Sequence, residues 1–167
     1  MWGVGPKVDP IPIEATFLTL NVNRRLVDKC EELSAMFGQL NPAPKVIFIQ
    51  EAGMLGQDPA GALELLLPDF TAFLASSESD GKRRVPRSHN ASVVTLVAKT
   101  LAPSVRRIGR APNGAALLVQ VGEVLLVNTY LPADLDWASP HSRVAEQADL
   151  TYEWIADQLK GDLGTDH

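Results

Sequence analysis

The sequence predicts a layered α/β sandwich with a mixed, largely antiparallel sheet. Its first half reads as strand, helix, strand, which is the order of a parallel crossover unit. Its second half reads as short strands joined by tight turns, which is the order of an antiparallel meander, followed by an amphipathic helix. Strands of both kinds with helices between them pack into layers around one core.

The composition is that of one globular domain. The 167 residues are 46% hydrophobic and 21% charged, which are ordinary values for a folded chain with a sizeable core. The single cysteine excludes an intramolecular disulfide and favours a reducing compartment. No apolar run approaches the roughly 20 residues of a membrane span, and the first residues lack the layout of a signal peptide. We expect an intracellular protein of the nucleus or cytoplasm that is not secreted and has no membrane partner.

The first strand, helix and second strand follow from the apolar spacing. Residues 16–22 are β-branched and apolar, and residues 46–50 are almost wholly apolar, so both predict buried strands. Between them, spacings of three and four predict a helix that ends at the prolines of 41–44. Residues 1–13 predict a loose lead-in, and 14–167 the folded domain. The buried helix face would carry Leu26, Cys30, Leu33, Phe37 and Leu40.

A second helix and a third strand come next. Asp58 followed by Pro59 is a typical helix start, because aspartate caps the free amides and proline suits the first helical position. This helix is expected to reach Leu67. Residues 70–75 predict a short strand, and 76–90 predict a polar, basic loop.

The second half predicts strands in close succession. Gly122 and Glu123 alone separate the last two strands, which predicts an antiparallel hairpin with a type II′ turn. Four strands joined by short turns are expected over residues 91–98, 104–108, 115–121 and 124–130.

The chain then forms a last helix. Ser139 and Pro140 would open this helix, and Gly161 would end it. Its apolar face would carry Val144, Ala148, Tyr152, Ile155 and Leu159.

The charge is unevenly distributed. The net charge of −5 argues against a general polyanion binder, yet residues 82–110 contain eight bases and no acid. This basic segment could contact a phosphate backbone. The alternative is a set of solvated loops whose bases pair with acids elsewhere in the fold. The eight bases are Lys82, Arg83, Arg84, Arg87, Lys99, Arg106, Arg107 and Arg110.

Polar residues stand where the first two strands end. Asn21 and Asn23 close the first strand, and Gln50 and Glu51 close the second. If these strands are parallel neighbours, both ends meet at one sheet edge, where ligand sites of open α/β sheets gather. A carboxylate with amides suits a hard cation, above all Mg²⁺. The alternative is that Asn21 bonds the backbone of a turn and Glu51 lies in solvent.

Three further positions have competing interpretations. Tyr130 follows the last strand and could place a phenol beside the same site, although such a tyrosine is usually core packing with its hydroxyl at the rim. Cys30 lies on the apolar helix face and is expected to be buried and inert. Trp154 could stack on nucleic-acid bases, although packing in the core or at its rim is the expected role.

Taken in order, four segments resemble the endonuclease/exonuclease/phosphatase superfamily. The family contains apurinic endonucleases, pancreatic-type deoxyribonucleases and the endonuclease domains of non-LTR retrotransposons, and the retrotransposon and apurinic branch is the most similar. An amphipathic helix rich in arginine, glutamate and glutamine follows, as it does in the family. The four segments are Leu20-Asn21-Val22-Asn23, Ile47 to Glu51, Ala91 to Val97, and Val127 to Pro132.

The resemblance implies a pancreatic-deoxyribonuclease-like sandwich and a DNA endonuclease that attacks a phosphodiester with water. Glu51 would ligate the catalytic Mg²⁺, for which Mn²⁺ could substitute. Asn21 would contact the metal site or the scissile phosphate, and Tyr130 would lie near that phosphate. Asn23 stands where the family often has aspartate, so its role is open. Phosphate contacts would come from Lys82, Arg83, Arg84 and Arg87.

The sequence departs from the family pattern after this point. The family continues with a strand ending in Gly-Asp-x-Asn and later closes with Ser-Asp-His, whose Asp–His pair helps to activate water. Residues 161–167 echo these motifs only by chance. The resemblance therefore implies an incomplete domain, completed by a C-terminal half or covered in a homo-oligomer. Two alternatives stay open: an inactive relic with at most weak nucleic-acid binding, and an inositol or lipid phosphatase of the same superfamily.

Overall fold

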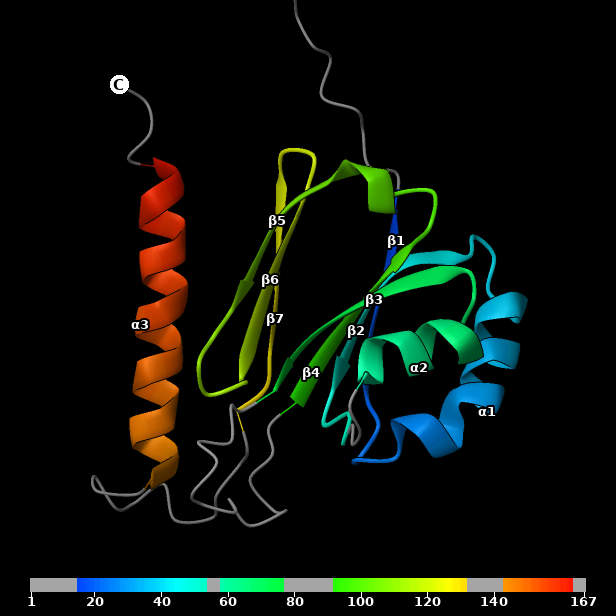
Figure 1. The fold of residues 1–167 in the computed structure, drawn as a ribbon, viewed down its shortest axis with the longest axis horizontal. Helices are drawn as coiled ribbons and strands as arrows, with labels where there is room; N and C mark the ends of the chain where they lie inside the picture. The colour runs from blue at the N-terminus through cyan, green and yellow to red at the C-terminus, as the bar shows by residue number, and fades with distance from the viewer. Residues whose placement is uncertain (1–14, 54–57, 77–91, 132–142, 164–167) are drawn as a thin grey trace, which may run out of the picture.

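The structure is a computed structural model that describes residues 15–53, 58–76, 92–131 and 143–163. These residues form two β-sheets and three α-helices (Figure 1). The predicted mixed α/β class is therefore confirmed. The expected lead-in over 1–13 lies outside the described residues.

The first sheet is mixed and has the strand order β1-β2-β4-β3. Strands β1 (Thr16–Asn21) and β2 (Pro44–Gln50) pair in parallel, and α1 (Leu26–Gln39) connects them. The crossover unit is thus confirmed. Strand β4 (Ser92–Ala98) pairs antiparallel with both β2 and β3 (Phe70–Ser76).

Helices α1 and α2 (Pro59–Leu66) pack on one face of this sheet. The side chain of Asp58 accepts a hydrogen bond from the amide of Gly61 at 3.0 Å, so the predicted cap is confirmed. Leu40 is a wrong prediction: it is the C-cap of α1, has an extended backbone and is 40% exposed. The helix ends one residue before it, and Leu40 therefore leaves the apolar face. The buried face of α1 carries Leu26, Cys30, Leu33 and Phe37.

The second sheet contains β5 (Val105–Arg110), β6 (Ala116–Val121) and β7 (Val124–Thr129), all antiparallel. A short 3₁₀ helix, Ala102–Ser104, leads from β4 into β5. The sequence predicts one meander through β4 to β7, and this is wrong for β4, which belongs to the first sheet. The reason is burial: β4 is covered on both faces and takes a central place between β2 and β3.

The predicted hairpin between β6 and β7 is confirmed. Val121 pairs with Val124, which leaves a two-residue turn. Gly122 has φ +58°, whereas Glu123 does not have a positive φ. This combination is that of a type II′ turn, in which the first central residue alone is left-handed.

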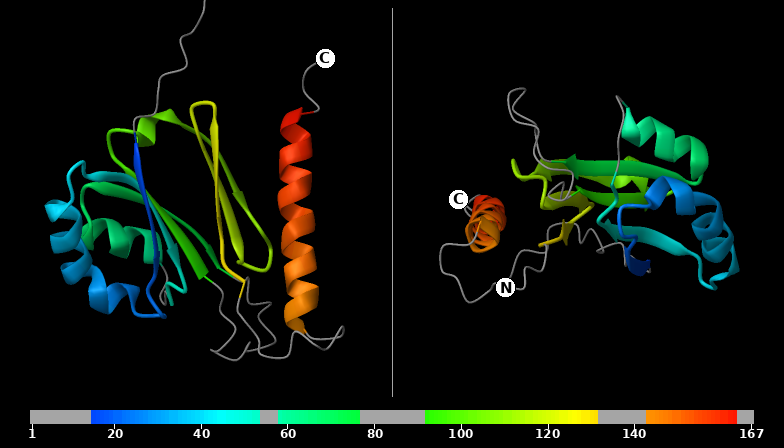
Figure 2. Two further views of the ribbon diagram at one scale, coloured as in Figure 1. Left: turned by 180° about the vertical axis from the view of Figure 1, so that it is seen from behind. Right: turned by 90° about the horizontal axis from the view of Figure 1, so that it is seen from below.

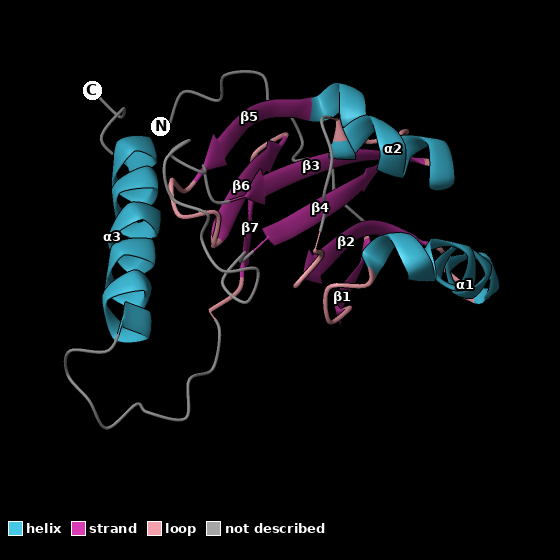
Figure 3. Cartoon of the chain, turned by 60° about the horizontal axis from the view of Figure 1, so that its bottom comes forward, coloured by secondary structure: helices cyan, strands magenta, loops and turns pink. Residues whose placement is uncertain are grey.

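The two sheets pack face to face through a shared apolar core. Helices α1 and α2 lie outside the first sheet, and α3 (Arg143–Leu163) lies outside the second (Figures 1 and 2). Figure 3 shows the same separation of α3 from the other two helices. The layers are thus helices, sheet, sheet and helix. The buried residues between the sheets include Val46, Val93, Val97, Leu117, Val119 and Val121.

Helix α3 packs through part of the predicted face. Ala148 is buried and Ile155 half-buried, as predicted, whereas Tyr152 is 59% exposed, Leu159 is 39% exposed, and Thr151 is buried in their place. Asn113, after β5, donates a hydrogen bond to the Thr151 hydroxyl at 2.7 Å, so a polar contact sets the rotation of the helix. The helix also continues through Gly161 to Leu163, because a glycine in the last turns of a helix costs only about 1 kcal/mol. Ser139 and Pro140 lie outside the described residues. None of the described helices has the length and apolarity to cross a membrane.

Leu117→Ala should lower the free energy of unfolding by about 2–5 kcal/mol, because the side chain is fully buried between the sheets. Leu65→Ala is the matched control: Leu65 is 85% exposed on α2 and should cost less than about 0.5 kcal/mol. Urea unfolding measures both values. Similar losses for the two variants would contradict the packing described here.

Candidate functional site

The carboxyl ends of β1 and β2 bring the predicted Asn21 and Glu51 together. The two strands are parallel, and Asn21 lies opposite Gln50 in the register. The side-chain amide of Asn21 donates to Oε1 of Glu51 at 3.0 Å. The predicted adjacency is confirmed, and it follows from the parallel pairing of residues 30 apart in sequence.

Tyr130 reaches the same carboxylate from the second sheet. It follows β7, and its backbone amide donates to the carbonyl of Ala115 at 2.9 Å. Its phenol donates a short hydrogen bond to Oε1 of Glu51. The structure therefore joins Asn21, Glu51 and Tyr130, which we call the strand-end cluster.

The cluster keeps its carboxylate charged and its phenol protonated. The hydrogen bond from Tyr130 lowers the pKa of Glu51 most, and the bond from Asn21 and the charge of Arg24 lower it further against the opposing effect of burial. Burial, followed by the hydrogen bond to Glu51 and its charge, raises the pKa of Tyr130 to about 12. At neutral pH the cluster thus presents one anion and one neutral O–H donor.

Two loops with left-handed residues carry the cluster. Asn23, Arg24 and Glu51 have φ of 48°, 62° and 52°. The amide of Arg24 donates to the carbonyl of Glu51 at 2.5 Å. A Cβ on Gly53, which has φ +65°, would lie 2.6 Å from the carbonyl oxygen of Arg24, so only glycine fits where the loops meet. Non-glycine residues in this conformation cost of order 1–3 kcal/mol each and gather at functional sites.

Asn23 has a backbone role in this arrangement. Its amide donates to Oδ1 of Asn21 at 3.0 Å. The amide group of Asn21 is thereby held with its oxygen toward Asn23 and its nitrogen toward Glu51. Asn21 therefore acts as a hydrogen-bond donor that orients the carboxylate of Glu51.

A buried amide network lies directly beneath the cluster. Asn128 of β7 is 1% exposed, and its side-chain nitrogen donates to the carbonyls of Ile49 at 3.2 Å and Val94 at 2.9 Å. Its oxygen accepts from Gln50 at 2.9 Å. The sequence motifs assign no role to Asn128 itself. The available signal was a single polar residue at an inward position of an otherwise apolar strand.

The cluster fits a divalent cation held through one carboxylate. Among the described residues, hydrogen bonds to Glu51 converge on Oε1, and none is made to Oε2. No group of three or more histidine, cysteine or acidic side chains occurs in the described part of the chain. Mg²⁺ commonly retains several waters and binds through one or two carboxylates together with substrate phosphates. Glu51 suits that mode of binding.

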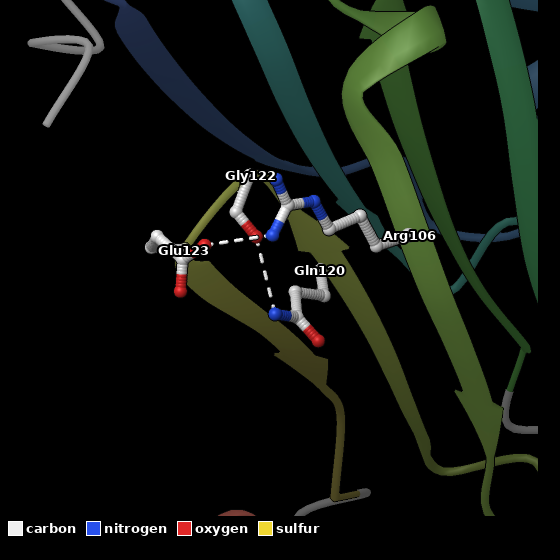
Figure 4. A network of polar contacts seen from close by, with 4 residues as sticks. All are labelled: Arg106, Gln120, Gly122 and Glu123. Atoms are coloured by element: carbon white, nitrogen blue, oxygen red, sulfur yellow. Dashed lines mark hydrogen bonds and ion pairs between the residues drawn. The ribbon is translucent and has the colours of Figure 1, made fainter. Parts of the chain in front are cut away.

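Three of the four described bases of the basic segment make side-chain contacts within the chain, and the fourth, Lys99, is exposed. Arg106 forms an ion pair with Glu123 at 2.7 Å beside the β6–β7 turn, at the end of β7 opposite to Tyr130 (Figure 4). Arg107 donates to Gln158 of α3 at 2.5 Å, and Arg110 donates to the carbonyl of Leu74 at 2.8 Å. Of these described bases, the alternative of pairing with acids is thus confirmed for Arg106 alone, because Arg107 bonds an amide side chain and Arg110 a backbone carbonyl. Outside the described residues lie Lys82, Arg83, Arg84 and Arg87.

Two other predicted positions are structural. Cys30 is buried in the α1 core, and burial raises the pKa of its thiol, as expected for an inert cysteine. The ring of Trp154 lies 3.3 Å from where a Cβ on Gly109 would be, so it packs against β5.

Comparison with protein-family models and with curated proteins found no match to this sequence. The assignment of a function therefore depends on the geometry of the strand-end cluster and on the sequence motifs.

Spectrophotometric titration should detect the Glu51–Tyr130 contact. The chain has only two tyrosines, so Tyr152→Phe isolates Tyr130. In that variant, the tyrosinate absorbance should report a pKa near 12. Adding Glu51→Gln should lower this pKa while leaving it above the ordinary value, because burial remains. As a control, circular dichroism must show a folded chain across the titration.

The raised pKa of Tyr130 also makes the stability of the fold depend on pH. Tyr130 is protonated more firmly in the folded chain than in the unfolded one, so its contribution is complete below pH 10 and is lost as the pH rises toward 12. If the pKa of Tyr130 were the same with and without Glu51→Gln, that result would contradict the hydrogen bond between Tyr130 and Glu51.

Proposed function

We propose that this chain is a divalent-cation-dependent phosphodiester hydrolase acting on DNA. The observation that carries the proposal is the convergence of an ionised carboxylate, an amide and a neutral phenol from three strand ends. The same three residues are those to which the resemblance to the endonuclease/exonuclease/phosphatase superfamily assigns the metal and phosphate contacts. This coincidence supports an apurinic- or retrotransposon-type endonuclease.

Each residue has a defined task in the proposed reaction. Glu51 would hold the cation, Mg²⁺ or Mn²⁺, and Asn21 keeps the carboxylate oriented. A bound cation neutralises charge that develops on the phosphoryl and leaving-group oxygens. Tyr130 remains protonated, and its single O–H would turn from Glu51 to a non-bridging phosphate oxygen when the substrate binds. Water adds to phosphorus, the ester bond to one sugar oxygen breaks, and the products are a phosphate monoester and a hydroxyl.

The inactive relic remains the competing function. Proton removal from the attacking water needs a base, and Glu51 is the only acidic side chain in the strand-end cluster. A chain that binds DNA without cleaving it would have the same cluster. A phosphatase acting on inositol phosphates or lipid head groups would also share it, and hydrolysis of an inositol phosphate in place of DNA would identify that activity.

Glu51→Gln should reduce the nicking of supercoiled plasmid by on the order of a hundredfold or more, because the variant loses the negative charge at the cation site. The assay compares Mg²⁺ with EDTA for the purified chain. Glu123→Gln is the matched control, since Glu123 is an exposed carboxylate at the opposite end of β7. Equal nicking by the wild type and Glu51→Gln would remove Glu51 from the reaction.

A folded chain that binds plasmid in Mg²⁺ without nicking it would favour the relic. Glu51→Gln must retain the circular dichroism of the wild type for either conclusion.

Replacing Arg83, Arg84 and Arg87 by glutamine should weaken DNA binding and reduce the slope of log K against log salt concentration by about 3, because three phosphate contacts and their released counterions are lost. Arg106→Gln is the control, since Arg106 already pairs with Glu123. Fluorescence anisotropy with a duplex at several salt concentrations measures both slopes. An unchanged slope for the triple variant would identify these arginines as a solvated surface.

A further inference from the structure

A pocket of about 450 Å³ opens at the end of the first sheet that is opposite to the strand-end cluster. It lies between the last turns of α1, the chain that follows α2, the start of β2 and the end of β4. Lys45 near the start of β2 lines it, whereas Glu51 follows the other end of the same strand. The pocket is therefore separate from the proposed reaction site.

The floor of the pocket is formed by apolar core residues that are almost fully buried. Phe37 and Phe70 meet edge to face with ring centroids 5.9 Å apart, and Leu67 is 2% exposed beside them. All three belong to the main core beneath α1 and α2. Preformed pockets of 300–1,000 Å³ with mainly apolar walls are the usual form of small-molecule sites.

The rim of the pocket carries a positive charge. Lys45 and Lys99 both line it and are exposed, and neither forms an ion pair within the described residues. Asp69 is the single acidic residue of the lining, and its carbonyl accepts a hydrogen bond from the amide of Lys99 at 3.0 Å. The residues that line the pocket thus carry a formal excess of one positive charge.

We propose that this pocket binds a small amphipathic anion, with its apolar body against Phe37, Leu67 and Phe70 and its anionic group at Lys45 and Lys99. Burial of the body supplies most of the affinity, at about 25 cal/mol per Å² of apolar surface. The lysines select an anion over a neutral molecule of the same shape. The site does not depend on the proposed phosphodiesterase activity.

The first test compares two fluorescent probes with almost the same aromatic body. Anilinonaphthalene sulfonate carries an anionic group, and phenylnaphthylamine does not. The wild type should bind the sulfonate at one site and about tenfold more tightly than the neutral probe at low salt. The double variant Lys45→Gln/Lys99→Gln should lose this preference while it still binds both probes.

The second test fills the pocket. Gly38 lines it on α1, and a Cβ added there would meet no atom within 4 Å. Gly38→Leu should therefore abolish binding of the sulfonate without disturbing the fold, because leucine is also a better helix former than glycine. Gly38→Ala is the matched control, which adds one methyl group and should bind as the wild type does.

Leu65→Gln distinguishes pocket binding from adhesion to surface hydrophobic groups. Leu65 is 85% exposed and lies outside the pocket lining, so this variant should bind the sulfonate normally. The proposal is overturned if the wild type binds no sulfonate, if Gly38→Leu binds it as well as Gly38→Ala does, or if the double lysine variant keeps the preference for the anion.

Discussion

The buried amide of Asn128 is the contact on which the arrangement of the sheets depends. Its nitrogen bonds the carbonyls of Ile49 and Val94 in the first sheet, and its oxygen accepts from Gln50. A buried amide that lost these partners would cost about 1–3 kcal/mol. The bonds therefore oppose sliding of β7 across β2. Tyr130 lies two residues beyond Asn128, and Glu51 directly follows Gln50, so this register determines whether phenol and carboxylate meet.

The strand-end cluster separates the proton affinities of two groups that share one hydrogen bond. The phenol stabilises the carboxylate of Glu51 and lowers its pKa, while burial and that same carboxylate raise the pKa of Tyr130. Environments that move two titratable groups in opposite directions give each a fixed protonation state. At neutral pH the result is an anion that accepts the O–H of a neutral phenol.

The first sheet has chemically different ends. At the carboxyl end of β2, left-handed residues in two interlocked loops present Glu51. At the amino end, α1 and the segment after α2 leave an apolar pocket with two lysines at its rim. Both features follow from the crossover unit, because α1 begins beside one end of the sheet and finishes beside the other. The proposed reaction and the proposed anion binding can thus be tested by separate sets of variants.

The sequence by itself determined the local elements and one half of the site. Apolar periodicity located the strands and helices to within a few residues, because each element depends on neighbours along the chain. The predicted parallel pairing of the first two strands placed Asn21 beside Glu51, because that pairing depends on a single crossover. Local patterns could not show that β4 joins the first sheet, or that α3 packs with Thr151 toward Asn113.

The contact of Tyr130 with Glu51 and the network around Asn128 were decided only by the tertiary structure. These contacts join residues almost 80 positions apart in two different sheets. These contacts form only at one position of the second sheet relative to the first. Alternation of apolar and polar residues tells which face of a strand is buried, but it carries no information about that relative position.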